Sequence, residues 1–204
     1  MLHYATVLPD TLQLLRDIQA IPQMSGYPLV GGTALALQIG HRLSIDLDFF
    51  GNSNLALDTI KAELEKLGPL LVDNRSESIL NLRIRNIKVD VARYRYPLIA
   101  PTVSNDGLIL AGIEDIAAMK LSAVVGRGSK KDFIDIYFLL NSYTLEEMMR
   151  LFRRKISDES DLMIARSLTY FVDADKEVMP DMLVPVEWSA VKERIKHAVK
   201  DAWF

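Results

Sequence analysis

Two aspartates stand one residue apart in SIDLDFF, an apolar stretch at residues 44–50. Alternating polar and apolar residues predict a β-strand, in which Asp46 and Asp48 share one face and the large apolar side chains share the other. Two carboxylates that lie close together on a partly buried face repel each other and resist desolvation. Because a divalent cation would remove both problems, this pair predicts a metal site.

A third carboxylate is available in IKVDVARY, where Asp90 stands between two valines of another predicted strand. If the two strands are neighbours, three carboxylates could hold one or two ions. Oxygen ligands in a chain without cysteine favour Mg²⁺ or Mn²⁺ over zinc. Two ions about 3.5–4 Å apart suit in-line phosphoryl or nucleotidyl transfer. The alternatives are a D-x-D pattern without metal and an Asp90 that faces solvent on an edge strand.

A glycine turn precedes the aspartates, at the junction of a short predicted strand, YPLV, and a predicted helix, TALALQI, which Gly40 ends. Gly31 and Gly32 allow the backbone to approach a ligand closely, and the helix start presents unpaired N–H groups and a positive dipole end. These features predict a phosphate cradle. The alternative is a simple strand-to-helix turn in which Thr33 caps the helix.

GGTALAL followed by GHRLSIDLDFF resembles motif I of the nucleotidyltransferase superfamily. The form with His41, Arg42 and Ser44 before the aspartates is most similar to the AbiEii/AbiGii toxin family. VDVARY, EDIAAMKLSAVVGRGSKKDFIDIYFLL and YFVDADKEVMP extend the resemblance over most of the chain. The chain is shorter than many such toxins, which puts part of their acceptor-binding region in doubt.

The resemblance implies a toxin-like enzyme of toxin–antitoxin and phage-defence systems. Such an enzyme transfers an NMP from an Mg²⁺-bound or Mn²⁺-bound NTP to an acceptor, here RNA such as tRNA, and has a cognate antitoxin as a further partner. Two other readings stay open: transfer to a small molecule or protein, and a non-catalytic toxin–antitoxin interaction module. The residues implied are catalytic Asp46, Asp48, Lys120 and Asp132, nucleotide-binding Gly31, Gly32, Thr33, Arg42, Ser44 and Lys120, and metal-binding Asp46, Asp48 and Asp90.

Several of these residues have simpler explanations. Lys120 lies on an apolar helical stripe, from which it could reach a triphosphate or extend from the core edge to solvent. Asp132 could activate the acceptor hydroxyl or join the metal shell, with Asp135 bracing it, or it could complete a capping box with Ser129. Arg42 could contact phosphate or be a surface arginine. Ser44 could contact phosphate, be a modification site or be a plain polar strand end.

Composition narrows the class of protein. The 204 residues carry a net charge of -3 and include no cysteine. The absence of cysteine excludes disulfides, thiolate metal sites and a cysteine nucleophile. No signal peptide is predicted and no apolar stretch approaches the ~18 residues of a membrane span, so we expect a cytoplasmic protein that binds no membrane. An acidic chain would need local basic groups to hold RNA: Arg127, Lys130, Lys131 and the cluster Arg150–Lys155. A solvated helix face is the alternative for that cluster.

The patterns predict an α/β fold of the α+β type, a mixed sheet with flanking helices followed by a helical part, and the resemblance implies that this sheet is nucleotidyltransferase-like. Strands are expected near residues 70–72, 79–84 and 87–94, with a hairpin turn at Arg85–Asn86. Every strong pattern after residue 112 is helical. We therefore expect a nucleotidyltransferase-like core at residues 1–112 and, at residues 113–204, a helical region that completes the site. Residues 97–112 are expected to connect them.

Overall fold

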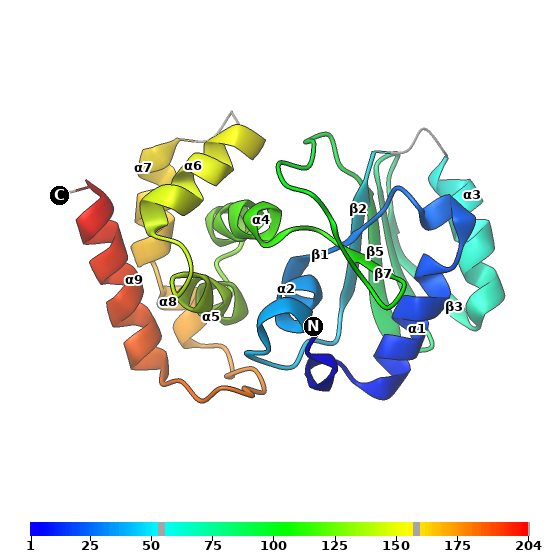
Figure 1. Ribbon diagram of the computed structural model, residues 1–204, viewed down its shortest axis with the longest axis horizontal. Coiled ribbons are helices and arrows are strands. Elements are labelled where there is room, and N and C mark those ends of the chain that lie inside the picture. The colour runs from blue at the N-terminus through cyan, green and yellow to red at the C-terminus, as the bar shows by residue number, and fades with distance from the viewer. Residues whose placement is uncertain (53–55, 157–159, 204) are drawn as a thin grey trace. The chain divides into compact units, whose positions relative to one another are not determined.

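The computed structural model describes residues 1–52, 56–156 and 160–203 (Figure 1). The chain forms two compact units. The first comprises Met1–Pro97 and Pro101–Gly112, and the second comprises Leu98–Ala100 and Ile113–Phe204. No helix in the described ranges is long and apolar enough to cross a membrane.

The first unit is built on a seven-stranded sheet with the order β3-β4-β5-β2-β1-β7-β6. Strand β2 is parallel to β5 and antiparallel to β1, and β1 is parallel to β7, so the sheet is mixed as predicted. The strands are β1 Leu29–Val30, β2 Leu47–Gly51, β3 Leu70–Arg75, β4 Ile79–Ile84, β5 Ile87–Arg93, β6 Val103–Asn105 and β7 Leu108–Leu110.

Helices cover both faces of this sheet: α1 and α3 lie on one side and α2 on the other (Figure 1). Their bounds are α1 Pro9–Gln19, α2 Gly31–Ile39 and α3 Leu57–Leu64, with 3₁₀ turns at Tyr4–Thr6, Pro22–Met24 and Glu65–Leu67. Gly40 ends α2 with a φ of 72°, and its N–H bonds the carbonyl of Ala36, as the sequence predicts.

Residues 97–112 are more than a connection, because they contain the hairpin of β6 and β7. Asp106 and Gly107 form its turn with φ angles of 50° and 78°. An Asp-Gly pair favours such a turn because both positions need a positive φ. The prediction of a plain linker is therefore wrong, since the hairpin adds two strands to the sheet.

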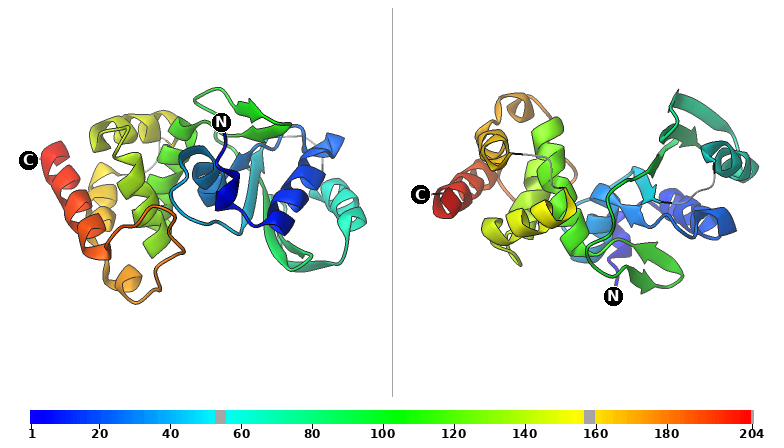
Figure 2. Two further views of the ribbon diagram at one scale, coloured as in Figure 1. Left: turned by 60° about the horizontal axis from the view of Figure 1, so that its bottom comes forward. Right: turned by 90° about the horizontal axis from the view of Figure 1, so that it is seen from above.

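The second unit is helical, as predicted. It consists of α4 Ile113–Gly126, α5 Lys130–Leu139, α6 Leu145–Lys155, α7 Asp161–Thr169, α8 Val172–Asp175 and α9 Trp188–Trp203. Helix α4 packs against α5, α6 and α7, and α9 packs against α5, α6 and α7 from outside (Figure 2). The rings of Phe133, Phe171 and Trp188 meet at centroid distances of 4.8–6.0 Å and join α5 to α9.

Candidate active site

The aspartates predicted to bind metal lie at the centre of the sheet. Asp48 in β2 is directly opposite Asp90 in β5, and Asp90 is opposite Asn81 in β4. Neighbouring strands stand about 4.8 Å apart, so side chains paired on one face can reach each other. Asp46 precedes the start of β2 at Leu47, so it belongs to the loop that enters the strand. The prediction that both aspartates alternate within one strand is therefore wrong for Asp46.

The two faces of these strands differ as the alternation requires. Leu47 and Phe49 of β2, with Val89 and Val91 of β5, are fully buried on the apolar face. The carboxylates on the opposite face are only half-buried. We call this opposite face, with Asp46, Asp48 and Asp90, the acidic face. Its carboxylates keep access to solvent and to ligands.

The glycine turn between β1 and α2 runs against the acidic face. Gly31 has a φ of +71°, which L side chains rarely adopt, and a Cβ at this position would overlap the carboxylate of Asp48. Gly31 also begins α2, and the first N–H groups of a helix have no partner within it. Glycine is thus needed for both conformation and space, and it brings a helix N-terminus beside a strand carboxylate.

Arg42 places a positive charge against the same turn. Its side chain is buried, and a Cβ added to Gly32 would lie 2.5 Å from its Nη2. The Nη1 atom donates to the carbonyl of Leu43 at 3.0 Å. The structure therefore excludes a surface arginine. The guanidinium adds to the positive potential of the helix start, which favours an anion there.

Thr33 and Ser44 tie the turn to the loop that carries Asp46. The Thr33 hydroxyl lies 2.8 Å from Ser44 Oγ and also donates to the backbone carbonyl of Asp46. Thr33 is the third residue of α2, and no side chain caps that helix. The prediction of Thr33 as an N-cap is therefore wrong. Both hydroxyls are buried and hold the glycine turn and Asp46 in a fixed relation.

Asp90 is engaged by two side chains that were not predicted for the site. Asn81 Nδ2 donates to its Oδ1 at 2.8 Å, and Lys88 Nζ lies 2.9 Å from its Oδ2. The hydrogen bond to Asp90 raises the pKa of Lys88, and the charges of Asp90, Asp46 and Asp48 raise it further against partial burial. A hairpin turn at Arg85–Asn86 sets Asn81 opposite Asp90 and could have revealed this pair.

Among residues 1–52, 56–156 and 160–203, no three Asp, Glu, His or Cys side chains are gathered as in a formed metal site. The acidic face nevertheless supplies the right donors, because half-buried carboxylate oxygens suit Mg²⁺ or Mn²⁺. Asp90 would have to exchange its present partners for the ion. The donor set therefore fits Mg²⁺ or Mn²⁺.

The second unit contains a separate charged group around Lys120. Its Nζ lies 3.0 Å from Asp132 Oδ1 and 2.6 Å from Asp135 Oδ2, and both carboxylates are fully buried. The lysine side chain is only 4% exposed, so it does not extend to solvent. We call these three residues the buried charge group, together with Ser129 and the exposed Arg127, which also bond Asp132. Asp135 was predicted to brace Asp132. The two carboxylates are linked through Lys120, because both pair with its ammonium group.

Asp132 is held by more donors than any capping role requires. Arg127 donates to it through Nε at 2.7 Å and Nη2 at 2.9 Å, and Ser129 Oγ donates at 2.7 Å. Burial alone would raise the pKa of Asp132, but hydrogen bonds from Arg127 and Ser129 and the charge of Lys120 hold it well below its usual range. Ser129 caps no helix N–H with its side chain, so the capping box is not formed.

Most of the basic residues expected to meet RNA are bonded within the protein, among them Arg127 to Asp132, Arg153 to Asp161 and Arg154 to the carbonyl of Ile99. Lys155 Nζ lies 2.6 Å from Asp115 Oδ1, with both side chains fully buried. The amide of Lys130 donates to the Glu177 carboxylate at 2.8 Å, and its ammonium binds the Glu177 carbonyl. The range Arg150–Lys155 therefore does not act as one basic surface.

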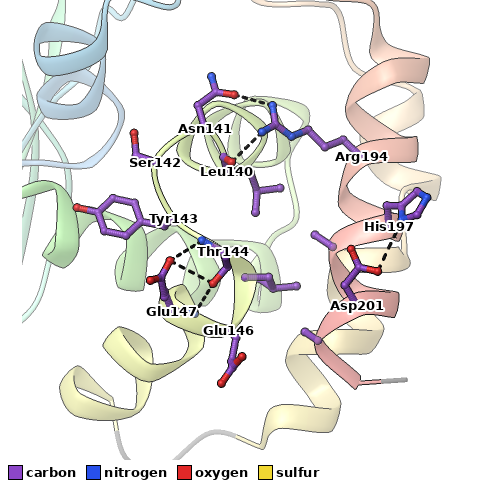
Figure 3. A pocket seen from close by; sticks show the side chains of 13 residues that line it. Leu140, Asn141, Ser142, Tyr143, Thr144, Glu146, Glu147, Arg194, His197 and Asp201 are labelled. Atoms are coloured by element: carbon purple, nitrogen blue, oxygen red, sulfur yellow. Dashed lines mark hydrogen bonds and ion pairs between the residues drawn. The ribbon is translucent and has the colours of Figure 1, made fainter.

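A cavity of about 550 Å³ opens on the second unit between the start of α6 and the end of α9 (Figure 3). Its polar side chains bond one another: Arg194 donates to Asn141 at 2.7 Å, and Thr144 and Glu147 form a capping box. None of the predicted site residues lines it. A smaller cavity of about 360 Å³ is lined by Arg127, by Arg166 and Ser167 of α7, and by Tyr170, which follows the last residue of α7.

The mixed sheet with a glycine turn against strand carboxylates places the first unit among nucleotidyltransferase folds. The crystal structure of JHP933 from Helicobacter pylori is similar, with a TM-score of 0.56 and 16% identity over 96% of this chain and 93% of that chain. The nucleotidyltransferase toxin MenT4 from Mycobacterium tuberculosis matches with a TM-score of 0.57 and 17% identity over 95% of this chain and 86% of that one. At these identities the likeness shows the fold.

Sequence comparison shows the family. The family described as "Nucleotidyl transferase AbiEii toxin, Type IV TA system" matches residues 13–110 and 108–203. The uncharacterised protein aq_aa25 of Aquifex aeolicus is 36% identical over 195 residues, which cover 93% of this chain and 94% of that protein. The chain therefore belongs to the AbiEii nucleotidyl transferase toxin family, and the resemblance seen in its motifs is confirmed.

Proposed function

We propose that this protein transfers an NMP from an NTP to an acceptor hydroxyl and depends on Mg²⁺ or Mn²⁺. One observation carries the proposal: the backbone at Gly31 packs directly on the carboxylate of Asp48, which stands opposite Asp90 in the parallel pair of β2 and β5. A phosphate-binding turn and carboxylates for its metal thus lie side by side. Asp46, Asp48 and Asp90 would hold the ion, which when bound polarises the α-phosphate and offsets the charge on the leaving pyrophosphate.

The chain's own groups bind and orient the nucleotide. The N–H groups at the start of α2 and the buried guanidinium of Arg42 favour the triphosphate, while Thr33 and Ser44 fix the turn relative to Asp46. The acceptor oxygen bonds the α-phosphorus as the bond to the bridging oxygen of the β-phosphate breaks. The hydroxyl proton passes to a carboxylate of the acidic face, and pyrophosphate leaves.

Lys120 and Asp132 act together in this proposal. We assign Lys120 to the triphosphate because of the family to which the chain belongs; its two buried carboxylate partners, within 3.0 Å, stabilise its positive charge. Asp132 has a lowered pKa and is therefore a weak base. We assign it the task of positioning Lys120 and Arg127 instead of activating the acceptor hydroxyl.

The test is pyrophosphate release and label transfer from each α-labelled NTP with Mg²⁺ and total RNA. We expect both to vanish in the Asp46→Asn/Asp48→Asn double variant. Asp58→Asn is the matched control, because Asp58 is an exposed helix residue paired with Arg75. Full activity in the double variant, or none in the wild type with any NTP, would contradict the proposal.

We propose RNA as the acceptor and a cognate antitoxin as the biological partner, in keeping with a toxin–antitoxin role in phage defence within the cytoplasm. The cavity lined by Arg166 and Tyr170 supports RNA, because a guanidinium group binds phosphate and an exposed tyrosine can stack on a base. The alternatives are transfer to a small molecule or protein and a non-catalytic interaction module.

The acceptor is tested with the same label. Transfer to RNA should fall with rising salt, with a slope of about -0.7 per phosphate contact on single strands, and should weaken in Arg166→Gln. Arg75→Gln, on β3 of the first unit, is the control of equal charge change. Label that appears on protein or a small molecule, and is indifferent to salt and to Arg166, would replace the RNA proposal with transfer to that acceptor.

A further inference from the structure

A lysine occupies the acidic face, where the metal is proposed to bind. Lys88 precedes Asp90 by two residues in β5, so strand alternation puts both side chains on one face. Its Nζ lies 2.9 Å from Asp90 Oδ2, while Asn81 Nδ2 holds Oδ1 at 2.8 Å. Both oxygens of this carboxylate are therefore engaged before any ion arrives.

The positive charge of Lys88 interacts with all three carboxylates of the acidic face. The carboxylates of Asp46 and Asp48 act on it in addition to that of Asp90. Three carboxylates on one face repel one another, and an ammonium among them reduces this repulsion. In the structure Lys88 thus supplies part of the charge compensation that a divalent ion would supply.

The two partners of Asp90 differ in how easily they can leave. The Lys88 side chain is 47% exposed, whereas that of Asp90 is 17% exposed. A lysine has a flexible four-carbon stem and a strongly hydrated ammonium, so its charge can move into solvent or onto another anion. Asn81 has a short side chain whose reach is fixed by its place in β4. Lys88 is therefore the partner that an incoming ion displaces.

We propose that Lys88 is a built-in counter-ion of the acidic face, which competes with the divalent ion for Asp90 and moves to the triphosphate when metal and NTP bind together. This rests on the proposed function, because it takes the three aspartates as metal ligands. Lys88 is a positioning residue for the empty site and a phosphate contact in the loaded one.

The exchange couples the two ligands. A metal that arrives alone must displace the ammonium and leave it without an anion. A metal that arrives with an NTP brings phosphate oxygens for the displaced ammonium. Each ligand therefore strengthens the binding of the other, and this reciprocity is required of any equilibrium coupling.

The experiment measures Mn²⁺ binding by electron paramagnetic resonance, with and without a non-hydrolysable NTP analogue. Without nucleotide, Lys88→Met should bind Mn²⁺ roughly tenfold more tightly than the wild type, because a positive charge about 5 Å from the ion is gone. The gain in Mn²⁺ affinity on adding the analogue should shrink in this variant. Lys88→Arg keeps the charge and should retain the lower affinity of the wild type.

Lys66→Met is the matched control, because Lys66 is an exposed residue of the same unit that pairs with Glu63 at 2.7 Å. A purely structural role for Lys88 would lower Mn²⁺ affinity on substitution and could not raise it. If the wild type binds Mn²⁺ and Lys88→Met binds it equally or less tightly, the counter-ion role is overturned while the proposed function stands. If the wild type binds no Mn²⁺ even with the analogue, both are overturned.

Discussion

The acidic face and the buried charge group compensate their carboxylates in different ways. On the acidic face, Asp90 is half-buried and its cation, Lys88, is 47% exposed. In the buried charge group, Asp132 and Asp135 are fully buried and share Lys120, which is 4% exposed. A buried charge that loses its partner is costly, whereas an exposed pair is easily exchanged. The acidic face can therefore change its cation, and the buried charge group must keep its own.

Under the proposed function, this difference suits the two groups to different tasks. The acidic face would take up a metal with each substrate, which requires carboxylates whose partners can leave. Lys120 would present a fixed charge, which requires permanent anionic partners. Removing the cation should therefore destabilise the buried charge group much more than the acidic face.

The largest effect is expected for Lys120→Met. The variant leaves Asp132 and Asp135 buried without their shared cation, so the free energy of unfolding should fall by about 3–5 kcal/mol. Methionine keeps the packing of the aliphatic stem, so the loss measures the two ion pairs. Urea unfolding checks it, with Lys176→Met as the control because its pair with Asp173 is exposed. A loss below about 1 kcal/mol would mean that the group does not need its cation.

The next effect concerns the turn beside the acidic face. Gly31→Ala should lower the free energy of unfolding by about 1–3 kcal/mol, because alanine is strained at a φ of +71° and its Cβ overlaps Asp48. It should also weaken Mn²⁺ binding with the NTP analogue. Gly126→Ala is the control, since a Cβ there meets nothing within 4 Å. Equal stability and equal binding in both variants would show that the turn does not constrain Asp48.

A smaller effect should appear in acid. The folded pKa of Asp132 is lowered, so its stabilising contribution is present above the unfolded pKa, near 3.8, and is lost as pH falls toward the folded value. The free energy of unfolding should therefore decline below about pH 4. Urea unfolding between pH 2 and about 6 should show a shallower decline for Asp132→Asn. If the free energy of unfolding falls equally with pH in the wild type and in Asp132→Asn, ionised Asp132 does not stabilise the fold as proposed.

Features set by neighbouring residues were predictable from the sequence. The hairpin turn at Arg85–Asn86, with positive φ at both residues, joins β4 to β5 as expected, and Gly40 ends α2 as expected. The helices after residue 112 follow from their apolar spacing. The hairpin around Asp106–Gly107 was missed although an Asp-Gly turn is a local signal, because its strands have only three residues each.

Features set by distant contacts were not predictable. Lys155 lies 40 positions after Asp115, and only the packing of α6 on α4 makes them a buried pair. Thr33 suits an N-cap by residue type, but the loop before β2 offers its hydroxyl the carbonyl of Asp46. Lys88 could have been noticed from its two-residue spacing to Asp90, but its role depends on strands β2 and β5 being neighbours.

The central claim is that the metal binds on the acidic face. Anomalous diffraction from a crystal grown with Mn²⁺ and a non-hydrolysable NTP analogue tests this claim most directly. We expect the anomalous peak on the acidic face, about 2.2 Å from carboxylate oxygens of Asp46 and Asp48, with the analogue's phosphates at the Gly31 turn. Asp132 and Asp135 should keep their bonds to Lys120 and carry no peak. A peak on Asp132 or Asp135, or bound analogue with no metal on the acidic face, would contradict the account.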